Sequence, residues 1–356
     1  MVRAVVWEDG SVRFLDQTQL PEREVWITTD DPSVLVGAMQ CLAIRGAPLI
    51  GIAAAYGAVL AVHRLRDPLT DATIASLRRS LDAIAECRPT AVNLHAAIER
   101  MRMVLAYQTF GSRGELADAF LAEARAITHE DEAACEAIAR HGSPLVLPGS
   151  TLLTHCNTGS LATGGRGTAL GVITRAWEQG TVRHVYVCET RPLFQGSRLT
   201  AWELDRAGVP ATIITDSTTA VLFQQKKINA VFVGADRIAR NGDVANKIGT
   251  LGLALLARMH GIPFFVAAPM SSVDVGTQRG EDIPIEERSG DEIMVINGKR
   301  IAPSGSHAYA PAFDVTPADY VTAIITELGV CRPPLAPALS SMQKKVLQKA
   351  GTGTMA

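Results

Sequence analysis

The hydrophobic and polar positions of the chain follow two patterns, and the change between them falls near Pro148. Alternating apolar and polar residues come first, at 4–7, 12–15 and 24–28, and Asp9-Gly10 is a turn signal between the first two stretches. This alternation predicts a small antiparallel sheet. Apolar residues at helical spacing then predict helices at 32–41, 48–66, 70–86, 90–109 and 115–141.

Beyond Pro148, apolar β-rich runs alternate with helical stretches, which is typical of a parallel sheet with helices on both faces. The strands are expected at 151–155, 183–188, 211–215, 230–234 and 263–267. The helices are expected at 167–179, 197–207, 217–225, 245–260 and 317–328. We place the domain boundary in the long helix 115–141, which gives domains 1–128 and 129–345. The polar tail beyond about residue 335 is expected to fray.

Composition and charge argue against several classes of protein. The net charge is −2, and neither a basic excess nor an acidic block points to nucleic acid. The longest apolar runs stop near fourteen residues, which is too short to span a membrane, and the start of the chain has no signal-peptide pattern. The six cysteines show neither a CxxC pair nor metal-ligand spacing, so we expect reduced thiols, a cytoplasmic protein and no bound metal.

Polar and reactive residues follow the predicted strands, where ligands bind in doubly wound folds. Four successive strands are followed by such residues: His155-Cys156-Asn157-Thr158-Gly159-Ser160, then Glu189-Thr190-Arg191-Pro192 with Gln195-Gly196-Ser197-Arg198, then Asp216-Ser217-Thr218-Thr219, then Gly234-Ala235-Asp236-Arg237. Because the ends of parallel strands meet at one edge of a sheet, this concurrence predicts a site there.

Cys156 is the candidate reactive residue of this edge, and as a thiolate it could serve as a base. A lone cysteine is more often a buried small hydrophobe. The position of Cys156 at a strand end, in a loop rich in Asn, Thr, Gly and Ser, favours a chemical role instead. Backbone amides or cations nearby lower a thiol pKa from its usual value of about 8.5. Cys188 falls just before a strand end and is expected to face the core.

Asp236 is the candidate general acid. It follows the apolar run 230–234, and partial desolvation at the mouth of such a strand raises a carboxyl pKa towards useful values. An equally weighted interpretation is a helix cap, or an ion pair with Arg237 or Arg240.

Three segments are candidates for holding an anion at a helix start: Arg45-Gly46-Ala47-Pro48, Arg88-Pro89-Thr90 and Asn246-Lys247. The alternative is an ordinary turn or a solvent-facing helix end. Gly164-Gly165-Arg166-Gly167 has the spacing of neither a Walker loop nor a dinucleotide fingerprint. One small phosphate is therefore favoured over a nucleotide.

Long motifs between about residues 3 and 330 resemble those of the methylthioribose-1-phosphate isomerases of methionine salvage. They are IRGAPLIG at 44–51, RPTAVNL at 88–94, THCNTGSLAT at 154–163, GTALGVI at 167–173, VCETRPLFQGSRLTAWEL at 187–204, TDSTTA at 215–220, VGADRIARNGDVANKIGTLGLA at 233–254 and PAFDVTP at 311–317. One departure is Ala310, where the resemblance leads us to expect Asn before Pro311.

The resemblance implies an α/β protein with a mainly helical N-terminal domain carrying a small antiparallel sheet, and a Rossmann-like parallel-sheet C-terminal domain. It also implies a homodimer without a cofactor that acts on a phosphosugar. Cys156 and Asp236 would be its catalytic pair. Substrate binding would fall to Arg45, Gly46, Ala47, Arg88, Gln195, Asn246 and Lys247.

The wider family includes ribose-1,5-bisphosphate isomerases and non-catalytic regulatory subunits of a translation-initiation exchange factor. The regulatory subunits resemble relatives that lost the Cys and Asp, whereas this chain has both. The motifs RGAPLIG and QGSRLTAWEL favour the methylthioribose enzyme over the bisphosphate one. The expected reaction is 5-methylthioribose 1-phosphate to 5-methylthioribulose 1-phosphate. An isomerase of 5-deoxyribose 1-phosphate or ribose 1,5-bisphosphate, and a regulatory binding subunit, are the alternatives.

Overall fold

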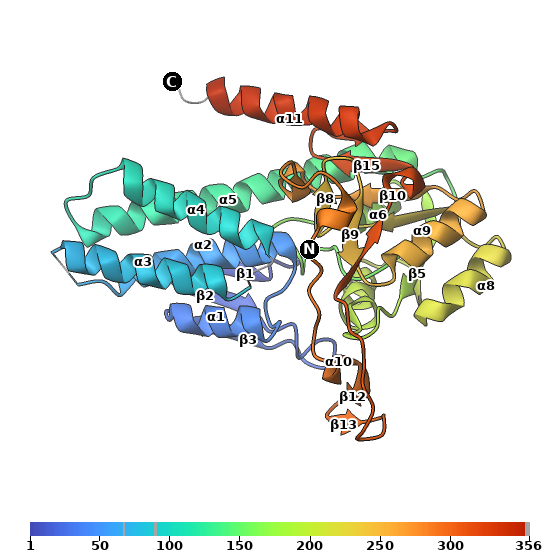
Figure 1. Ribbon diagram of the computed structural model, residues 1–356, viewed down its shortest axis with the longest axis horizontal. Helices are drawn as coiled ribbons and strands as arrows, with labels where there is room; N and C mark the ends of the chain where they lie inside the picture. Colours follow the sequence, from blue (N-terminus) through green and yellow to red (C-terminus); the bar gives the residue numbers. More distant parts are fainter. Residues whose placement is uncertain (67, 89–90, 353–356) are drawn as a thin grey trace. The chain divides into compact units, whose positions relative to one another are not determined.

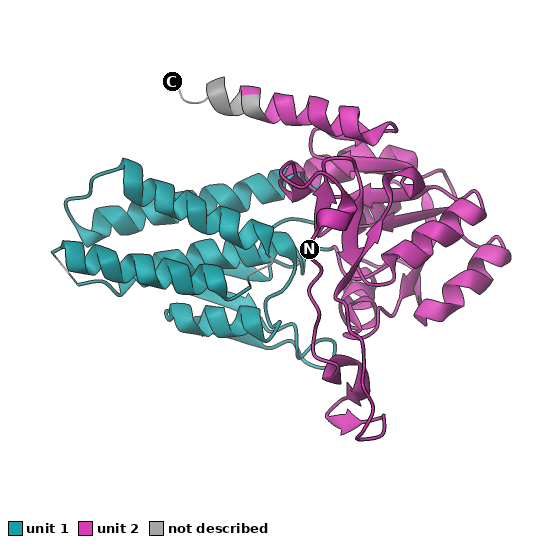
Figure 2. Cartoon of the chain, in the orientation of Figure 1, with its two compact units in different colours: residues 1–135, 159–167 teal, residues 136–158, 168–356 magenta. Residues whose placement is uncertain are grey.

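The computed structural model describes residues 1–66, 68–88 and 91–352, and the chain divides into two compact units (Figure 2). The first unit comprises residues 1–135 and 159–167, and the second comprises 136–158 and 168–356. The division falls inside the long helix α5 (Arg113–Gly142). Residues 159–167 belong to the first unit although the chain on both sides of them belongs to the second.

The first unit combines a small antiparallel sheet with long helices (Figure 1). The alternating stretches form its strands in the order β1-β2-β3, as their pattern predicts: β1 (Val5–Glu8), β2 (Ser11–Leu15) and β3 (Trp26–Thr29). The helices besides α5 are α1 (Pro32–Gln40), α2 (Ala47–His63), α3 (Asp71–Glu86) and α4 (Val92–Tyr107). Pro89 and Thr90, the predicted start of the fourth helix, lie outside the described residues.

Local sequence explains two of these helices. Thr70 begins α3 with a capping box, because its hydroxyl accepts the Thr73 N–H and the Thr73 hydroxyl accepts the Thr70 N–H. Helix α2 is apolar on every side, and its residues from Leu49 to Val62 are all buried, so its long apolar run belongs to the core of the first unit. Among the described residues, no helix combines the length and apolar character that a membrane crossing needs.

The second unit is built on a seven-stranded sheet in the order β16-β15-β10-β7-β4-β5-β6, and neighbouring strands are parallel except β15 and β16. The strands are β4 (Ser150–Thr154), β5 (Val182–Cys188), β6 (Ala211–Ile214), β7 (Ala230–Val233), β10 (Phe264–Ala267), β15 (Ala323–Thr326) and β16 (Gly329–Cys331). The helices are α6 (Ala169–Glu178), α7 (Ala201–Arg206), α8 (Thr219–Gln224), α9 (Thr250–Met259), α10 (Asp291–Met294) and α11 (Leu335–Thr352). The predicted α/β fold with a parallel-rich sheet is confirmed.

Both faces of this sheet are buried. Alternate residues of β7 point to opposite faces, so Val231 and Val233 join one apolar cluster and Phe232 joins another. Helix α9 contributes Leu253 to the first cluster, and α6 contributes Leu170 to the second. Strands buried on both faces read as continuous apolar runs, which leaves the strand ends as the place for polar chemistry.

Two predicted helices are wrong in whole or in part. The segment 245–260 begins with strand β9 (Val244–Lys247), and only Thr250–Met259 is helical. The segment 317–328 contains β15, whose four residues are all buried, and a short apolar run of this kind has no periodicity that separates a strand from a helix. The tail forms helix α11, where Leu335 and Leu339 are buried.

The remaining strands form two small sheets. β9 lies in a four-stranded sheet in the order β11-β8-β9-β14, with β8 (Arg237–Ala239), β11 (Val273–Asp274) and β14 (Phe313–Thr316). The other sheet is the hairpin of β12 (Val295–Ile296) and β13 (Lys299–Arg300).

Candidate active site

Cys156 and Asp236 follow the ends of two neighbouring parallel strands. In the register of β4 and β7, Thr154 is opposite Phe232, so both chains leave the sheet at the same edge. The segments beyond the strands also touch. A Cβ added to Gly234 would lie 2.7 Å from Cγ2 of Thr158, so only glycine lets these two segments pack this closely. Both Cys156 and Asp236 are partly exposed.

The backbone of Cys156 is held in the left-handed conformation, with φ of 61°. For a residue with a Cβ this conformation costs roughly 1–2 kcal/mol. Two buried hydroxyl groups hold it there. The Cys156 N–H donates to Thr190 Oγ1 at 2.8 Å, and the Cys156 carbonyl oxygen accepts from Thr200 Oγ1 at 2.6 Å. The direction of the thiol therefore depends on these two threonines.

Thr190 is itself fixed by the end of the next strand. Asp216, which follows β6, accepts the Thr190 N–H at 2.9 Å on Oδ1 and the Arg191 N–H at 2.7 Å on Oδ2. The Thr190 hydroxyl donates to the Cys188 carbonyl oxygen at 3.0 Å. Hydrogen bonds thus connect the ends of β4, β5 and β6 behind Cys156. Sequence reasoning placed these residues at the edge but assigned them no role.

His155 supports the same edge from the core. Its Nε2 lies 2.8 Å from the Ile248 carbonyl oxygen, and burial lowers the pKa of the ring, so the imidazole is neutral with its proton on Nε2. Its Nδ1 lies 3.9 Å from Asp216 Oδ1. Gly249, with φ of 106°, leaves room for the ring, because a Cβ there would lie 3.0 Å from the His155 Cε1.

Within the described part of the chain, His155, Cys188 and Asp216 bring three potential metal donors within 4.8 Å of one another. Their hydrogen bonding does not favour a metal. Both Asp216 oxygens accept backbone N–H groups, and burial, together with the Asp216 charge, raises the pKa of the Cys188 thiol, which favours its protonated form. Metals bind the thiolate. Cys188 is 1% exposed and packs in the core, as predicted.

Asn246 and Lys247 lie on strand β9 and not at the start of a helix, which corrects the prediction. Strand β9 lies beside Asp236, because the Asp236 N–H donates to the Ala245 carbonyl oxygen at 3.0 Å. Asn246 donates from Nδ2 to Thr250 Oγ1 at 2.9 Å. The pairing of β9 with β14, about 70 residues further along the chain, explains the error, since no local pattern reveals that partner.

Lys247 is a buried cation. It is 7% exposed, its Nζ lies 5.9 Å from the centre of the Phe313 ring, and it forms no ion pair with any residue that the structure describes. A charge removed from water is normally paired, because burying it alone is costly. The environment of Lys247 is therefore suited to an anionic ligand.

A cavity of about 250 Å³ opens beside Lys247. The other two cationic side chains that line the cavity already have hydrogen-bond or ion-pair partners. Arg191 donates to the Pro192 and Ile293 carbonyl oxygens, and Arg288 is paired with Glu286 and Glu292. The rest of the wall is mainly apolar, formed by Pro192, Ile248, Ile293, Tyr309, Ala310, Pro311 and Ala312.

Gln195 lies beside the end of β5. It is 7% exposed, and its Oε1 is buried without a hydrogen-bond partner among the described residues. Gly196 brings it there, since a Cβ on Gly196 would lie 1.7 Å from the Cys188 carbonyl oxygen. A buried amide oxygen without a donor is suited to accept a ligand hydroxyl.

The other predicted binding residues belong to the first unit. Gly46 begins α2 with φ of 99°, and a Cβ on it would lie 2.5 Å from the Cα of Ala162. The Leu49 N–H, in the first turn of α2, donates to the Ala162 carbonyl oxygen at 3.1 Å. Arg45 and Ala47 flank Gly46. The Arg88 guanidinium donates to the Met39 carbonyl oxygen at 3.5 Å.

Asp314 on β14 was not predicted as a site residue, although it falls in the PAFDVTP motif. Its carboxylate accepts the Gly249 N–H at 2.7 Å and the Leu251 N–H at 3.0 Å, and so caps helix α9 just after Lys247. Burial raises its pKa to about 6, against the opposing effect of these hydrogen bonds.

Replacing Asp314 with Asn is expected to reduce the pH dependence of the free energy of unfolding between about pH 4 and 6. The folded pKa of about 6 exceeds the ordinary value of 3.8, so the folded chain retains a proton that the unfolded chain releases. This contribution to stability is present below the lower value and is lost as the pH rises through the higher one. Urea unfolding across this range, with Asp205→Asn as the exposed control, measures it. Equal pH slopes for Asp314→Asn and the wild type would contradict it.

Comparison with known proteins identifies the family of the chain. A family model described as the initiation factor 2 subunit family matches residues 43–333. The methylthioribose-1-phosphate isomerase of Anaeromyxobacter dehalogenans is 50% identical over 343 residues, which cover 96% of this chain and 97% of that protein. The protein of the same name from Chloroflexus aurantiacus is 49% identical, with 96% and 99% covered.

Solved structures give the same result. The 5-methylthioribose 1-phosphate isomerase from Pyrococcus horikoshii OT3 matches with a TM-score of 0.91 and 39% identity, over 97% of this chain and 96% of that one. The translation initiation factor eIF-2B, subunit delta, from A. fulgidus matches with a TM-score of 0.85 and 41% identity, over 96% and 100%. The chain therefore belongs to the initiation factor 2 subunit family, and within it to the methylthioribose-1-phosphate isomerases.

Proposed function

We propose that this chain is an aldose–ketose isomerase that converts 5-methylthioribose 1-phosphate to 5-methylthioribulose 1-phosphate in methionine salvage. Relatives of that name, about half identical over nearly the whole chain, support the reaction. The structural observation that carries it is Lys247, a buried cation without a described anionic partner, on a strand paired with the Asp236 backbone. A phosphate ester supplies the missing anion.

Cys156 and Asp236 are the proposed catalytic pair. The anomeric carbon of the substrate carries the phosphate, so the ring cannot open as a free hemiacetal does. Asp236 would protonate the ring oxygen as the ring opens, and Cys156 as thiolate would remove the proton from C2 and return it to C1. The C2 hydroxyl would then give its proton to the Asp236 carboxylate as the ketone forms, which restores the acid. In the alternative route, a hydride moves directly from C2 to C1, and the same pair polarises the reacting groups.

The substrate contacts are proposed from the resemblance and from chemistry. Lys247 would hold the phosphate, with Arg45 and Arg88 as further candidate cations and the Gly46-Ala47 backbone at the start of α2. Gln195 and Asn246 would bind sugar hydroxyls. The apolar wall of the cavity beside Lys247, which includes Ala310 in place of the expected Asn, suits an uncharged methylthio group.

The wider family offers two alternative functions. A ribose-1,5-bisphosphate isomerase would need cations for a second phosphate, whereas the wall beside Lys247 is mainly apolar. A regulatory subunit is the second alternative, since a structure named as translation initiation factor eIF-2B, subunit delta, is 41% identical. The presence of both Cys156 and Asp236 favours the enzyme. We also propose a cytoplasmic homodimer without a cofactor, with catalysis in residues 129–345.

The direct test is incubation of the purified protein with 5-methylthioribose 1-phosphate in deuterated water. The ketose product should form, and deuterium at C1 would support proton transfer. Product without label would favour the hydride shift or a shielded proton. Faster turnover of ribose 1,5-bisphosphate would favour the bisphosphate enzyme. Absence of turnover on every sugar phosphate would refute the isomerase and favour the regulatory subunit.

Thr190→Val is expected to slow turnover about tenfold while the chain stays folded. Valine has nearly the same shape but leaves the Cys156 N–H without its acceptor, and a buried unmade hydrogen bond costs about 1–3 kcal/mol. The readout is the pH profile of kcat/KM together with the rate of thiol alkylation at Cys156. Thr190→Ser, which keeps the hydroxyl, should restore both. An unchanged pH profile and alkylation rate in Thr190→Val would remove Thr190 from the positioning of the thiol.

A further inference from the structure

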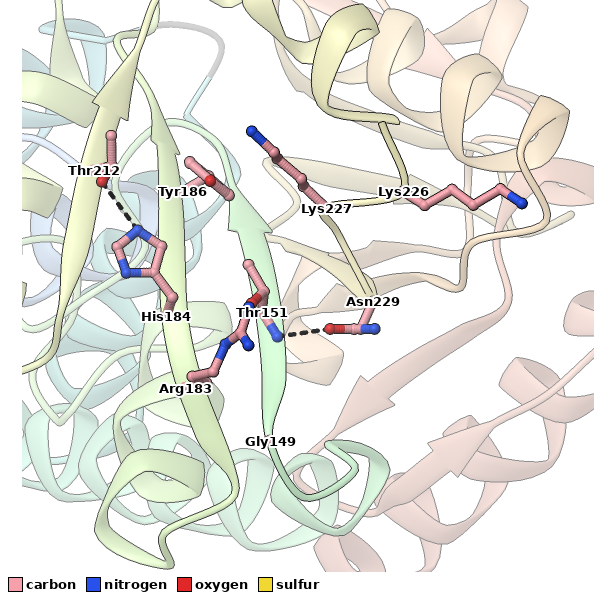
Figure 3. Close-up of a pocket in the computed structure, with 9 residues that line it drawn as sticks. All are labelled: Gly149, Thr151, Arg183, His184, Tyr186, Thr212, Lys226, Lys227 and Asn229. Atoms are coloured by element: carbon pink, nitrogen blue, oxygen red, sulfur yellow. Dashed lines mark hydrogen bonds between the residues drawn. The ribbon is translucent and has the colours of Figure 1, made fainter. Parts of the chain in front are cut away.

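A second cavity, of about 710 Å³, lies at the amino-terminal ends of the strands of the large sheet (Figure 3). It is lined by Gly149, Thr151, Arg183, His184, Tyr186, Thr212, Lys226, Lys227 and Asn229. We call it the basic pocket. Apart from Gly149, which precedes β4, these residues come from β4, β5, β6 and the segment between α8 and β7. Its volume falls in the range of roughly 300–1,000 Å³ that is typical of small-molecule sites.

The floor of the basic pocket is one face of the sheet. Thr151 is opposite His184 in the register of β4 and β5, and Tyr186 is opposite Thr212 in that of β5 and β6. Because side chains alternate along a strand, all four project to the same face. His184 Nε2 lies 3.0 Å from Thr212 Oγ1, and the His184 and Tyr186 rings meet edge to face. The floor of the basic pocket is thus polar and aromatic, whereas other side chains of this face, such as Leu153 and Val231, belong to an apolar cluster.

The charge of the basic pocket has a single sign. Arg183, Lys226 and Lys227 line it, and none of its lining residues that the structure describes is Asp or Glu. None of these three cations forms an ion pair with any residue of the described ranges. In Figure 3, Arg183 reaches towards Thr151 and Lys227 extends towards Tyr186, whereas Lys226 points away. Cations gathered around a concave surface without counter-charges raise the local concentration of anions.

A buried donor supplements these charges. Thr151 is 4% exposed, and its Oγ1 has no hydrogen-bond partner among the residues that the structure describes. Its backbone N–H is occupied, since it donates to Asn229 Oδ1 at 2.8 Å. The free hydroxyl can donate to an oxygen of a bound ligand. Buried hydroxyl groups are otherwise nearly always hydrogen-bonded in folded proteins.

The basic pocket is separate from the candidate active site. Thr151 is the second residue of β4 and Cys156 follows its end, and five residues of extended chain span about 16 Å. The two sites lie at opposite ends of the same strands. A sugar phosphate bound at the carboxyl ends would therefore leave the basic pocket accessible to a second ligand.

We propose that the basic pocket binds a small phosphorylated metabolite, with Arg183 and Lys227 holding the phosphate and the Thr151 hydroxyl donating to it. The volume accommodates more than a lone phosphate ion, and the polar floor offers further hydrogen bonds. This inference is independent of the reaction proposed above.

The test uses inorganic pyrophosphate as the probe and the full chain as the protein. Isothermal titration at low ionic strength should find one more pyrophosphate per chain in the wild type than in the Arg183→Gln/Lys227→Gln double variant. Thr151→Val should weaken this binding about tenfold, because a hydrogen bond to a charged group is lost. Lys299→Gln, which removes an exposed cation from β13, should bind like the wild type. Turnover of methylthioribose 1-phosphate should persist in the double variant.

Three results would overturn the proposal. The first is equal stoichiometry and affinity in the wild type and the double variant. The second is an equal heat when sodium chloride is titrated in place of pyrophosphate at matched ionic strength, which would indicate charge screening alone. The third is a double variant that loses self-association by light scattering but still binds pyrophosphate in full, which would assign the cations to a contact between copies of the chain.

Discussion

Replacing Cys156 with Ala is expected to lower kcat for 5-methylthioribose 1-phosphate by about 10²–10⁴-fold, the range in which positioned acid–base groups act. The methyl group of alanine tolerates the left-handed backbone about as well as cysteine does. The two threonine hydrogen bonds to the backbone of residue 156 also remain possible. The loss should therefore be chemical, and KM should change far less than kcat. Steady-state kinetics of product formation measures both.

The control for this variant is Cys41→Ala. Cys41 is an exposed free cysteine of the first unit, so its removal tests whether the loss of any thiol matters. It should leave kcat within twofold, on the order expected for a surface change. Near-normal turnover by Cys156→Ala would remove the thiol from the mechanism and leave Asp236 as the only proposed acid or base.

Asp236→Asn is expected to have an effect of similar size, about 10²–10⁴-fold on kcat. The amide keeps the size and polarity of the side chain, and the Asp236 N–H bond to the Ala245 carbonyl oxygen involves only backbone. The amide has no acidic proton to give to the ring oxygen. If Asp236 is the acid, the limb of the kcat profile that falls with rising pH should disappear in the variant. Measuring kcat between about pH 5 and 9, at intervals of about half a pH unit, shows whether that limb is present.

Asp205→Asn is the matched control, because Asp205 is an exposed carboxylate on α7 of the same unit. It should retain both the rate and the shape of the pH profile. If Asp236→Asn also retained the high-pH limb, the titrating acid would be another group. Asp314, whose pKa burial raises to about 6, would be the first to test.

The parallel core of the second unit was predictable because it is buried on both faces. Runs such as 230–234 are apolar at every position, which is the pattern of a central parallel strand. Once the strands were placed, the edge that carries Cys156 and Asp236 followed from the rule for ligand sites in such sheets. Lys247 was selected as a candidate because of its charge and of the resemblance, so the choice did not depend on the helix that was wrongly predicted in place of strand β9.

The supports of the site were not predictable in the same way. Thr190 and Thr200 hold Cys156 at a positive φ by hydrogen bonds to its backbone, and a cysteine gives no sign of that conformation in the sequence. Asp216 acts on backbone N–H groups of another loop, a contact that depends on the sheet order. Likewise, Asp314 caps α9 from a strand that pairs with β9 far along the chain. Contacts of this kind need the tertiary structure.

The excursion of residues 159–167 into the first unit means that neither unit is a continuous piece of polypeptide. A fragment beginning at Glu136 would retain β4 and its thiol. It would lose Gln17, whose amide donates at 2.7 Å to the carbonyl oxygen of the fully buried Leu161. Two fragments produced by dividing the chain between the units are therefore not expected to fold independently. Complementation by co-expressed fragments is the appropriate way to dissect this enzyme, with the segment 1–135 expected to rescue an otherwise insoluble partner.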